Sequence, residues 1–106
     1  MENLEFIYFQ SNEDLNEMTN RISYHVKKIR RLSKKKYILC KKLALQIVDD
    51  KVTNKKYIEH ILDNLVDVLM FYDEAEVVLF YKQLCEYYRT VDPRAAQHYF
   101  NIYQEL

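Results

Sequence analysis

The chain has 106 residues, enough for one domain with a single apolar core. It carries 16 Lys or Arg and 16 Asp or Glu residues, so its formal net charge at pH 7 is zero. It contains no glycine, which phosphate-binding loops, dinucleotide-binding turns and the nucleophile elbow need where backbone approaches a ligand or takes a positive φ. The composition therefore excludes those classes of enzyme.

The charges are segregated along the chain. Residues 1–17 hold five acidic side chains and no basic one, whereas residues 18–48 hold ten basic side chains and no acidic one. Residues 49–106 hold eleven acidic and six basic side chains. This distribution favours internal neutralisation, in which the acidic flanks fold against the basic middle, and an external acidic partner is the second interpretation.

Helical periodicity extends through nearly the whole chain. Apolar residues recur at spacings of three and four, and the only proline is Pro93, so we expect an all-α fold: a single compact bundle of four to five helices. The opening residues 1–10 include the aromatic and β-branched stretch LEFIYFQ, which has no second strand to pair with and predicts a short extended arm. The expected helices cover residues 11–32, 35–48, 54–72, 74–90 and 93–106.

The first two expected helices differ in pattern. The helix over residues 35–48 is apolar on most sides, because Ile38, Leu39 and Leu45 lie off its main stripe, and it is predicted to be the central helix. The first helix has one apolar stripe, formed by Leu15, Met18, Ile22, Val26, Ile29 and Leu32.

A reversal of the chain near Ser33 would place Lys34, Lys35 and Lys36 in the first turn of a helix, where cations oppose the helix dipole. Three arrangements resolve this conflict. The helix continues unbroken through Ser33, the acidic flanks lie beside the lysines, or an anion binds there.

The later helices have recognisable start signals. Asn54 is a predicted N-cap, and Asp73 followed by Glu76 resembles a capping box. Asp92 followed by Pro93 is typical of a cap with proline in the first turn.

Membrane and redox signals are few. The most apolar region, residues 57–88, is interrupted by acidic residues such as Asp63 and Asp67, so we expect no membrane span, and the acidic N-terminus predicts no secretory signal. Cys40 and Cys85 each stand alone, so neither a zinc site nor a disulfide is indicated. The expected location is cytoplasmic, or nuclear in a eukaryotic host.

Catalytic, metal and cofactor sites are not indicated. His25 falls on the apolar face of the first helix, where a structural role is expected. His60, Asp63 and Asp67 share one helix face at metal-compatible spacing, but this is also the solvated face, and nothing elsewhere in the sequence completes a site. We therefore expect no enzyme, no metal and no cofactor.

Apolar residues out of register give the better functional signal. Phe71 and Leu79 project from the polar faces of their helices near the same connection, and Met70 and Tyr87 lie at the margins of theirs. These four residues predict a surface covered by another protein. The expected function is a non-enzymatic protein-protein interaction module, a small regulator or inhibitor that covers a partner surface and can also form a homodimer. The amino-acid composition is of the type encoded by AT-rich genes, and this type is associated with phage, viral or plasmid-borne proteins.

A nucleic-acid-binding protein is the alternative. It would use the basic segment 27–42, although only Tyr37 offers a stacking group there and the net charge of the chain is zero. The candidate anion or nucleic-acid contacts are Lys27, Lys28, Arg30, Arg31, Lys34, Lys35 and Lys36.

Residues 77–103 resemble a tetratricopeptide helix pair. Ala96 and Phe100 match the small-then-aromatic spacing of the second helix, and Tyr87 matches the aromatic late in the first. The resemblance implies peptide or protein binding. The chain departs from the family pattern at its tryptophan, leucine and glycine positions, which are occupied by Phe80, Gln83 and Leu84.

Overall fold

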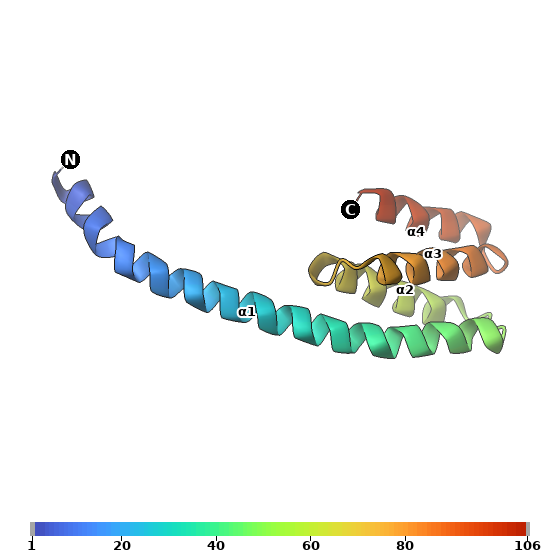
Figure 1. Cartoon of the computed structure of the whole chain (residues 1–106). Coiled ribbons are helices and arrows are strands. Elements are labelled where there is room, and N and C mark those ends of the chain that lie inside the picture. Colours follow the sequence, from blue (N-terminus) through green and yellow to red (C-terminus); the bar gives the residue numbers. More distant parts are fainter. Residues whose placement is uncertain (1, 106) are drawn as a thin grey trace. The chain divides into compact units, whose positions relative to one another are not determined.

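The computed structural model describes the backbone of residues 2–105 and the side chains of residues 14–105. Every regular element among these residues is a helix. Four helices follow one another along the chain: α1 (Glu2–Asp49), α2 (Lys55–Phe71), α3 (Ala75–Arg89) and α4 (Pro93–Glu105) (Figure 1). The all-α class predicted from the sequence is therefore confirmed.

The chain divides into two compact units, Met1–Arg31 and Leu32–Leu106. The first unit is helical from Glu2 onward, and the second contains the remainder of α1 together with α2, α3 and α4.

The second unit is a small helical bundle. α3 packs against both α2 and α4, and successive helices run in opposite directions because short connections join them (Figure 1). Its buried side chains form one apolar core, drawn from all four helices: Tyr37, Cys40, Ala44, Ile47, Ile58, Ile61, Leu62, Leu65, Val68, Leu69, Val77, Tyr81, Leu84, Cys85, Tyr88, Ala96 and Tyr99.

In this unit, α1 buries one narrow face. The ring of Tyr37 lies 6.2 Å from that of Tyr72 and 6.3 Å from that of Phe80, which joins α1 to the end of α2 and to α3. The prediction of a central helix was wrong, because the off-stripe residues Ile38, Leu39 and Leu45 are exposed. Residues buried on α1 repeat at helical spacing: Ser33, Tyr37, Cys40, Ala44 and Ile47.

The expected reversal near Ser33 does not occur, and within the expected arm over residues 1–10 the described residues 2–10 are helical. α1 continues through both regions as one helix. In an unbroken helix, Lys34, Lys35 and Lys36 lie in the middle of the helix, far from its N-terminus. Their charges therefore do not oppose the helix dipole at a helix start. The aromatic and β-branched residues of the opening stretch have only a weak intrinsic preference against helix, less than about 1 kcal/mol per residue.

The turn after α1 has a left-handed residue. Lys51 has a φ of 51°, and the N–H groups of Lys51 and Val52 donate to the carbonyl oxygens of Val48 and Ile47 at 3.3 and 3.0 Å. This pair of bonds is the Schellman motif, whose left-handed position is usually glycine. A chain without glycine makes the motif with lysine instead, at a steric cost of about 1–2 kcal/mol.

Side-chain caps begin α2 and α4. The Asn54 side chain accepts a hydrogen bond from the N–H of Tyr57 at 3.1 Å, and Asp92 Oδ1 accepts from the N–H of Ala95 at the same distance. Asp92 Oδ2 also lies 2.9 Å from Lys55 Nζ. The Lys55 ammonium, together with the Ala95 N–H, lowers the pKa of the Asp92 carboxyl below its ordinary value.

The start of α3 differs from the predicted capping box. Glu74 occupies the N-cap position in place of Asp73. Glu76 accepts a hydrogen bond from Lys41 Nζ at 2.6 Å, which ties α3 to α1 within the second unit.

Every buried core residue among those described lies between Tyr37 and Tyr99, within the second unit. We predict that a chain covering residues 32–106 unfolds cooperatively in urea, with a midpoint equal to that of the parent within error, as followed by circular dichroism. A non-cooperative transition would show that the first unit is needed for the core to form.

Candidate interaction surfaces

The first unit carries a row of exposed apolar side chains, which we call the apolar stripe: Leu15, Met18, Ile22, Val26 and Ile29. Their exposed fractions range from 39% for Ile29 to 57% for Leu15 and Val26. Side chains separated by three or four residues share one face of a helix. The stripe is therefore one continuous apolar face of α1 exposed to solvent.

The sequence predicts these residues, together with Leu32, as the apolar stripe of a helix in a compact bundle, where such a stripe is buried. The structure instead leaves them exposed. The same spacing of three and four continues along the sequence through Ser33 to Ile47, where the residues are buried. Helix length is the feature of the sequence that could have indicated this exposure. No later helix is long enough to cover every apolar position predicted between residues 11 and 48.

A second group of exposed apolar residues lies near the connection between α2 and α3. Met70, Phe71 and Leu79 are 63%, 51% and 52% exposed. Tyr87, the fourth residue predicted for this surface, is half-buried, and its hydroxyl donates to the Val52 carbonyl oxygen at 2.7 Å. The structure thus exposes three of the four candidates and gives Tyr87 a structural bond.

The basic candidates fall in both units. Lys27, Lys28, Arg30 and Arg31 are exposed on the first unit, and Lys34 and Lys35 are exposed on the second. Lys36 instead lies 3.5 Å from Asp67 of α2. Lys41, in the same basic segment, pairs with Glu76 and lies 5.0 Å from the centroid of the Phe80 ring. Part of the basic segment is therefore neutralised within the chain.

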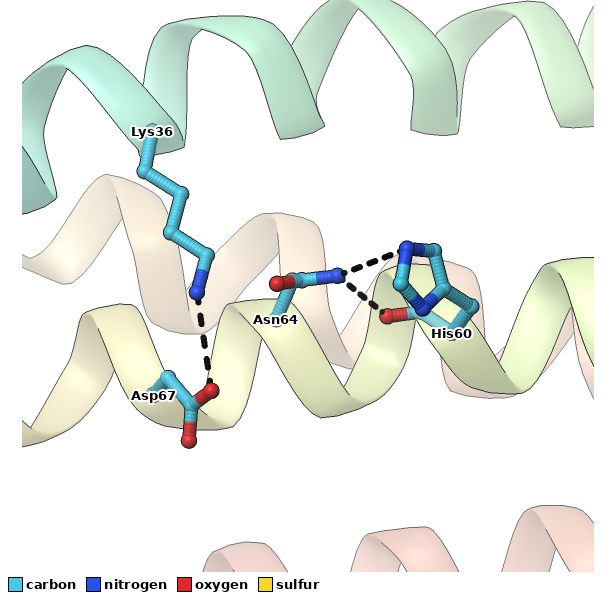
Figure 2. A network of polar contacts seen from close by, with 4 residues as sticks. All are labelled: Lys36, His60, Asn64 and Asp67. Carbon is cyan, nitrogen blue, oxygen red and sulfur yellow. Dashed lines mark hydrogen bonds and ion pairs between the residues drawn. The ribbon is translucent and has the colours of Figure 1, made fainter.

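The His60 face of α2 also makes contacts within the second unit (Figure 2). Asn64 Nδ2 donates to the His60 carbonyl oxygen at 2.8 Å and lies 3.3 Å from His60 Nε2, and Asp67 faces Lys36. Asp63 accepts a hydrogen bond from the Tyr99 hydroxyl at 2.9 Å. His60, Asp63 and Asp67 thus interact with three separate groups, and no three His, Cys, Asp or Glu residues of the described part are placed to hold a metal ion.

Tyrosine hydroxyls connect α3 and α4 to neighbouring elements. Tyr88 donates to Glu59 Oε2 at 2.7 Å, in addition to the bond from Tyr99 to Asp63. The hydroxyl of Tyr81 donates to the Tyr99 carbonyl oxygen at 2.5 Å. Burial raises the pKa of all three phenols, and the adjacent carboxylates raise those of Tyr88 and Tyr99 further. These groups stay protonated at neutral pH and act as hydrogen-bond donors.

Both cysteines are buried free thiols. Burial raises the pKa of Cys85 to about 11 and raises that of Cys40, an effect that Lys36 partly opposes. A thiol in this state is a poor nucleophile at neutral pH, because the thiolate is the reactive form. The geometry gives these residues a packing role.

A shallow groove lies at the end of the second unit where α1 meets the connection to α2. It is lined by apolar and hydroxyl-bearing side chains and by one lysine: Val48, Lys51, Thr53, Tyr87, Thr90 and Val91.

No model of a known protein family, no curated protein and no solved structure matches the chain. The tetratricopeptide resemblance of residues 77–103 therefore stays a resemblance of one helix pair. Within the described residues, no helix combines the length and the apolar character needed to cross a membrane.

Because the thiol and phenol pKa values are raised in the folded chain, the protein becomes less stable as the pH rises into the alkaline range. The folded chain holds the Cys85 proton more tightly than the unfolded chain does, so this stabilisation is present below pH 9.0, the ordinary thiol pKa, and is lost as pH rises toward 11. We predict that the urea midpoint is lower at pH 10.5 than at pH 8. The Cys85→Ala chain should show a smaller decrease, and an equal decrease in both chains would contradict the role of the thiol.

Proposed function

We propose that this protein is a non-enzymatic interaction module that binds a protein partner through the apolar stripe. The observation that carries this proposal is the row of five exposed aliphatic side chains from Leu15 to Ile29 on one face of a helix. Contiguous apolar surface of this kind is typical of sites that another protein covers.

The energetics support this use of the stripe. Fully burying an aliphatic side chain stabilises by about 1.5–3 kcal/mol relative to leaving it exposed. The five stripe residues are about half exposed, so a partner that covers them gains several kcal/mol before the cost of association, as an order-of-magnitude estimate. An amphipathic helix recognised through positions separated by three and four is a recurring mode of protein recognition.

The mode of action that we propose is coverage of a partner surface, as in a small regulator or inhibitor. Met70, Phe71 and Leu79 form a separate exposed surface on the second unit and would serve a second contact. The two buried free thiols are compatible with a reducing compartment such as the cytoplasm.

Charged substitutions on the stripe test this function. We predict that Ile22→Asp together with Ile29→Asp abolishes binding of the proteins captured by the parent chain, because a carboxylate would be desolvated in the interface. Binding is measured by affinity capture from native cells followed by mass spectrometry. Tyr24→Asp, on the opposite face of the same helix, is the matched control and should retain the partners. Equal capture by all three chains would remove the stripe as the binding surface.

An anionic partner, such as a nucleic acid, is the second candidate, favoured by the exposure of Lys27, Lys28 and Arg31 on the first unit. Binding through these residues would release counterions, so the logarithm of the affinity would fall linearly with the logarithm of the salt concentration. We expect little retention on random-sequence DNA at physiological salt if the stripe is the functional surface. Tight, salt-sensitive retention that is lost in Lys27→Ala with Lys28→Ala would favour the nucleic-acid function instead.

A further inference from the structure

The apolar stripe is symmetric about its central residue. Moving from Ile22 toward the N-terminus, the next apolar residues are four and seven positions away, at Met18 and Leu15. Moving toward the C-terminus, the next residues on the same helix face are again four and seven positions away, at Val26 and Ile29, whereas Tyr24 lies on the opposite face. A helix face with this symmetry presents the same pattern in both directions.

We propose that the occupant of the stripe is the stripe of a second copy of this chain, paired in the antiparallel direction with Ile22 at the centre. In this register Met18 lies opposite Val26 of the partner copy, and Leu15 lies opposite Ile29. Each of the five stripe residues on one copy then meets a stripe residue on the other. This inference rests on the proposed function, because it names the partner of that same surface.

Charge selects the antiparallel direction. Asp14 and Glu17 lie at one end of the stripe, and the other end carries Lys27, Lys28, Arg30 and Arg31. Antiparallel pairing brings the acidic end of each copy beside the basic end of the other, twice in a symmetric dimer. Helix axes in contact are about 8–10 Å apart, which is within about one Debye length at physiological salt. These charges therefore attract one another across the pair.

A parallel pair with the same apolar contacts would be disfavoured. It would place the acidic ends together and the basic ends together, and like charges at an interface suppress that arrangement. The stripe thus determines where the two helices touch, and the segregated charges determine their direction.

Disulfide trapping tests both the contact and its direction. In the antiparallel pair, position 18 of one copy lies at the same level as position 26 of the other. Positions 18 of the two copies are then eight residues apart along the axis, about 12 Å, which is too far for a disulfide. We therefore expect Met18→Cys and Val26→Cys chains to form a disulfide-linked dimer when mixed and oxidised, and neither chain to form one alone.

The native cysteines and the opposite helix face provide controls. The parent chain should give no crosslinked dimer, because Cys40 and Cys85 are buried. Tyr24→Cys, whose position faces away from the stripe, should also give none with either partner. Crosslinked dimers from Met18→Cys alone and from Val26→Cys alone would indicate a parallel pair and would overturn the proposal.

Exchanging the charges at the two ends of the stripe tests whether they select the antiparallel direction. Dimer formation by the full chain is measured by sedimentation equilibrium. The change Asp14→Lys with Glu17→Lys should weaken the dimer, and so should Lys27→Glu with Lys28→Glu and Arg31→Glu. Combining all five changes restores opposite charges at both ends and should recover association. Failure of the combined chain to recover would overturn the charge argument.

A parent chain that sediments as a monomer at every concentration would overturn self-pairing. That result would leave the proposed function standing, provided that the stripe variant Ile22→Asp with Ile29→Asp still loses its captured partners. Loss of the proposed function is a different outcome, in which this variant and the parent chain capture the same proteins.

Discussion

The lengths of the helices determine which apolar residues of α1 can be buried. α2, α3 and α4 have 17, 15 and 13 residues, whereas α1 has 48. A helix rises about 1.5 Å per residue, so α2 covers about 26 Å of any helix beside it. Within the second unit, this is enough to bury the α1 face between Ser33 and Ile47. On the first unit, apolar side chains at the same spacing are exposed.

Tyrosine imposes a second constraint, because a buried phenol needs a hydrogen-bond acceptor. Tyr88 and Tyr99 meet this need with the carboxylates of Glu59 and Asp63 on α2. Tyr81 uses a backbone carbonyl group of α4. The acidic residues on this side of α2 are consequently part of the packing of α3 and α4. Asp63, which the sequence placed on a metal-compatible face with His60 and Asp67, has this structural role.

The sequence predicted those features that depend on local chemistry. The helical class follows from periodicity, and the cap positions Asn54 and Asp92 follow from their side chains. Sequence reasoning failed where the outcome depends on what lies opposite a residue. An apolar stripe shows which side of a helix avoids water, but not whether the chain supplies a cover for it, so the exposure of Ile22 was missed. The reversal near Ser33 was inferred from the different apolar patterns of residues 11–32 and 35–48, although neither a glycine nor a proline is present there to break the helix. Met70, Phe71 and Leu79, which were predicted to form an interaction surface, are exposed, whereas Tyr87 is bonded within the fold.

Lys51 has a consequence for how the protein can change. In a chain without glycine, its left-handed backbone is a conformation in which most other residues would be equally strained. A mutation to glycine there would relieve that strain without altering the apolar stripe or the buried core. A single substitution in the turn after α1 could thus raise the stability of the chain and compensate for destabilising substitutions accumulated elsewhere during evolution.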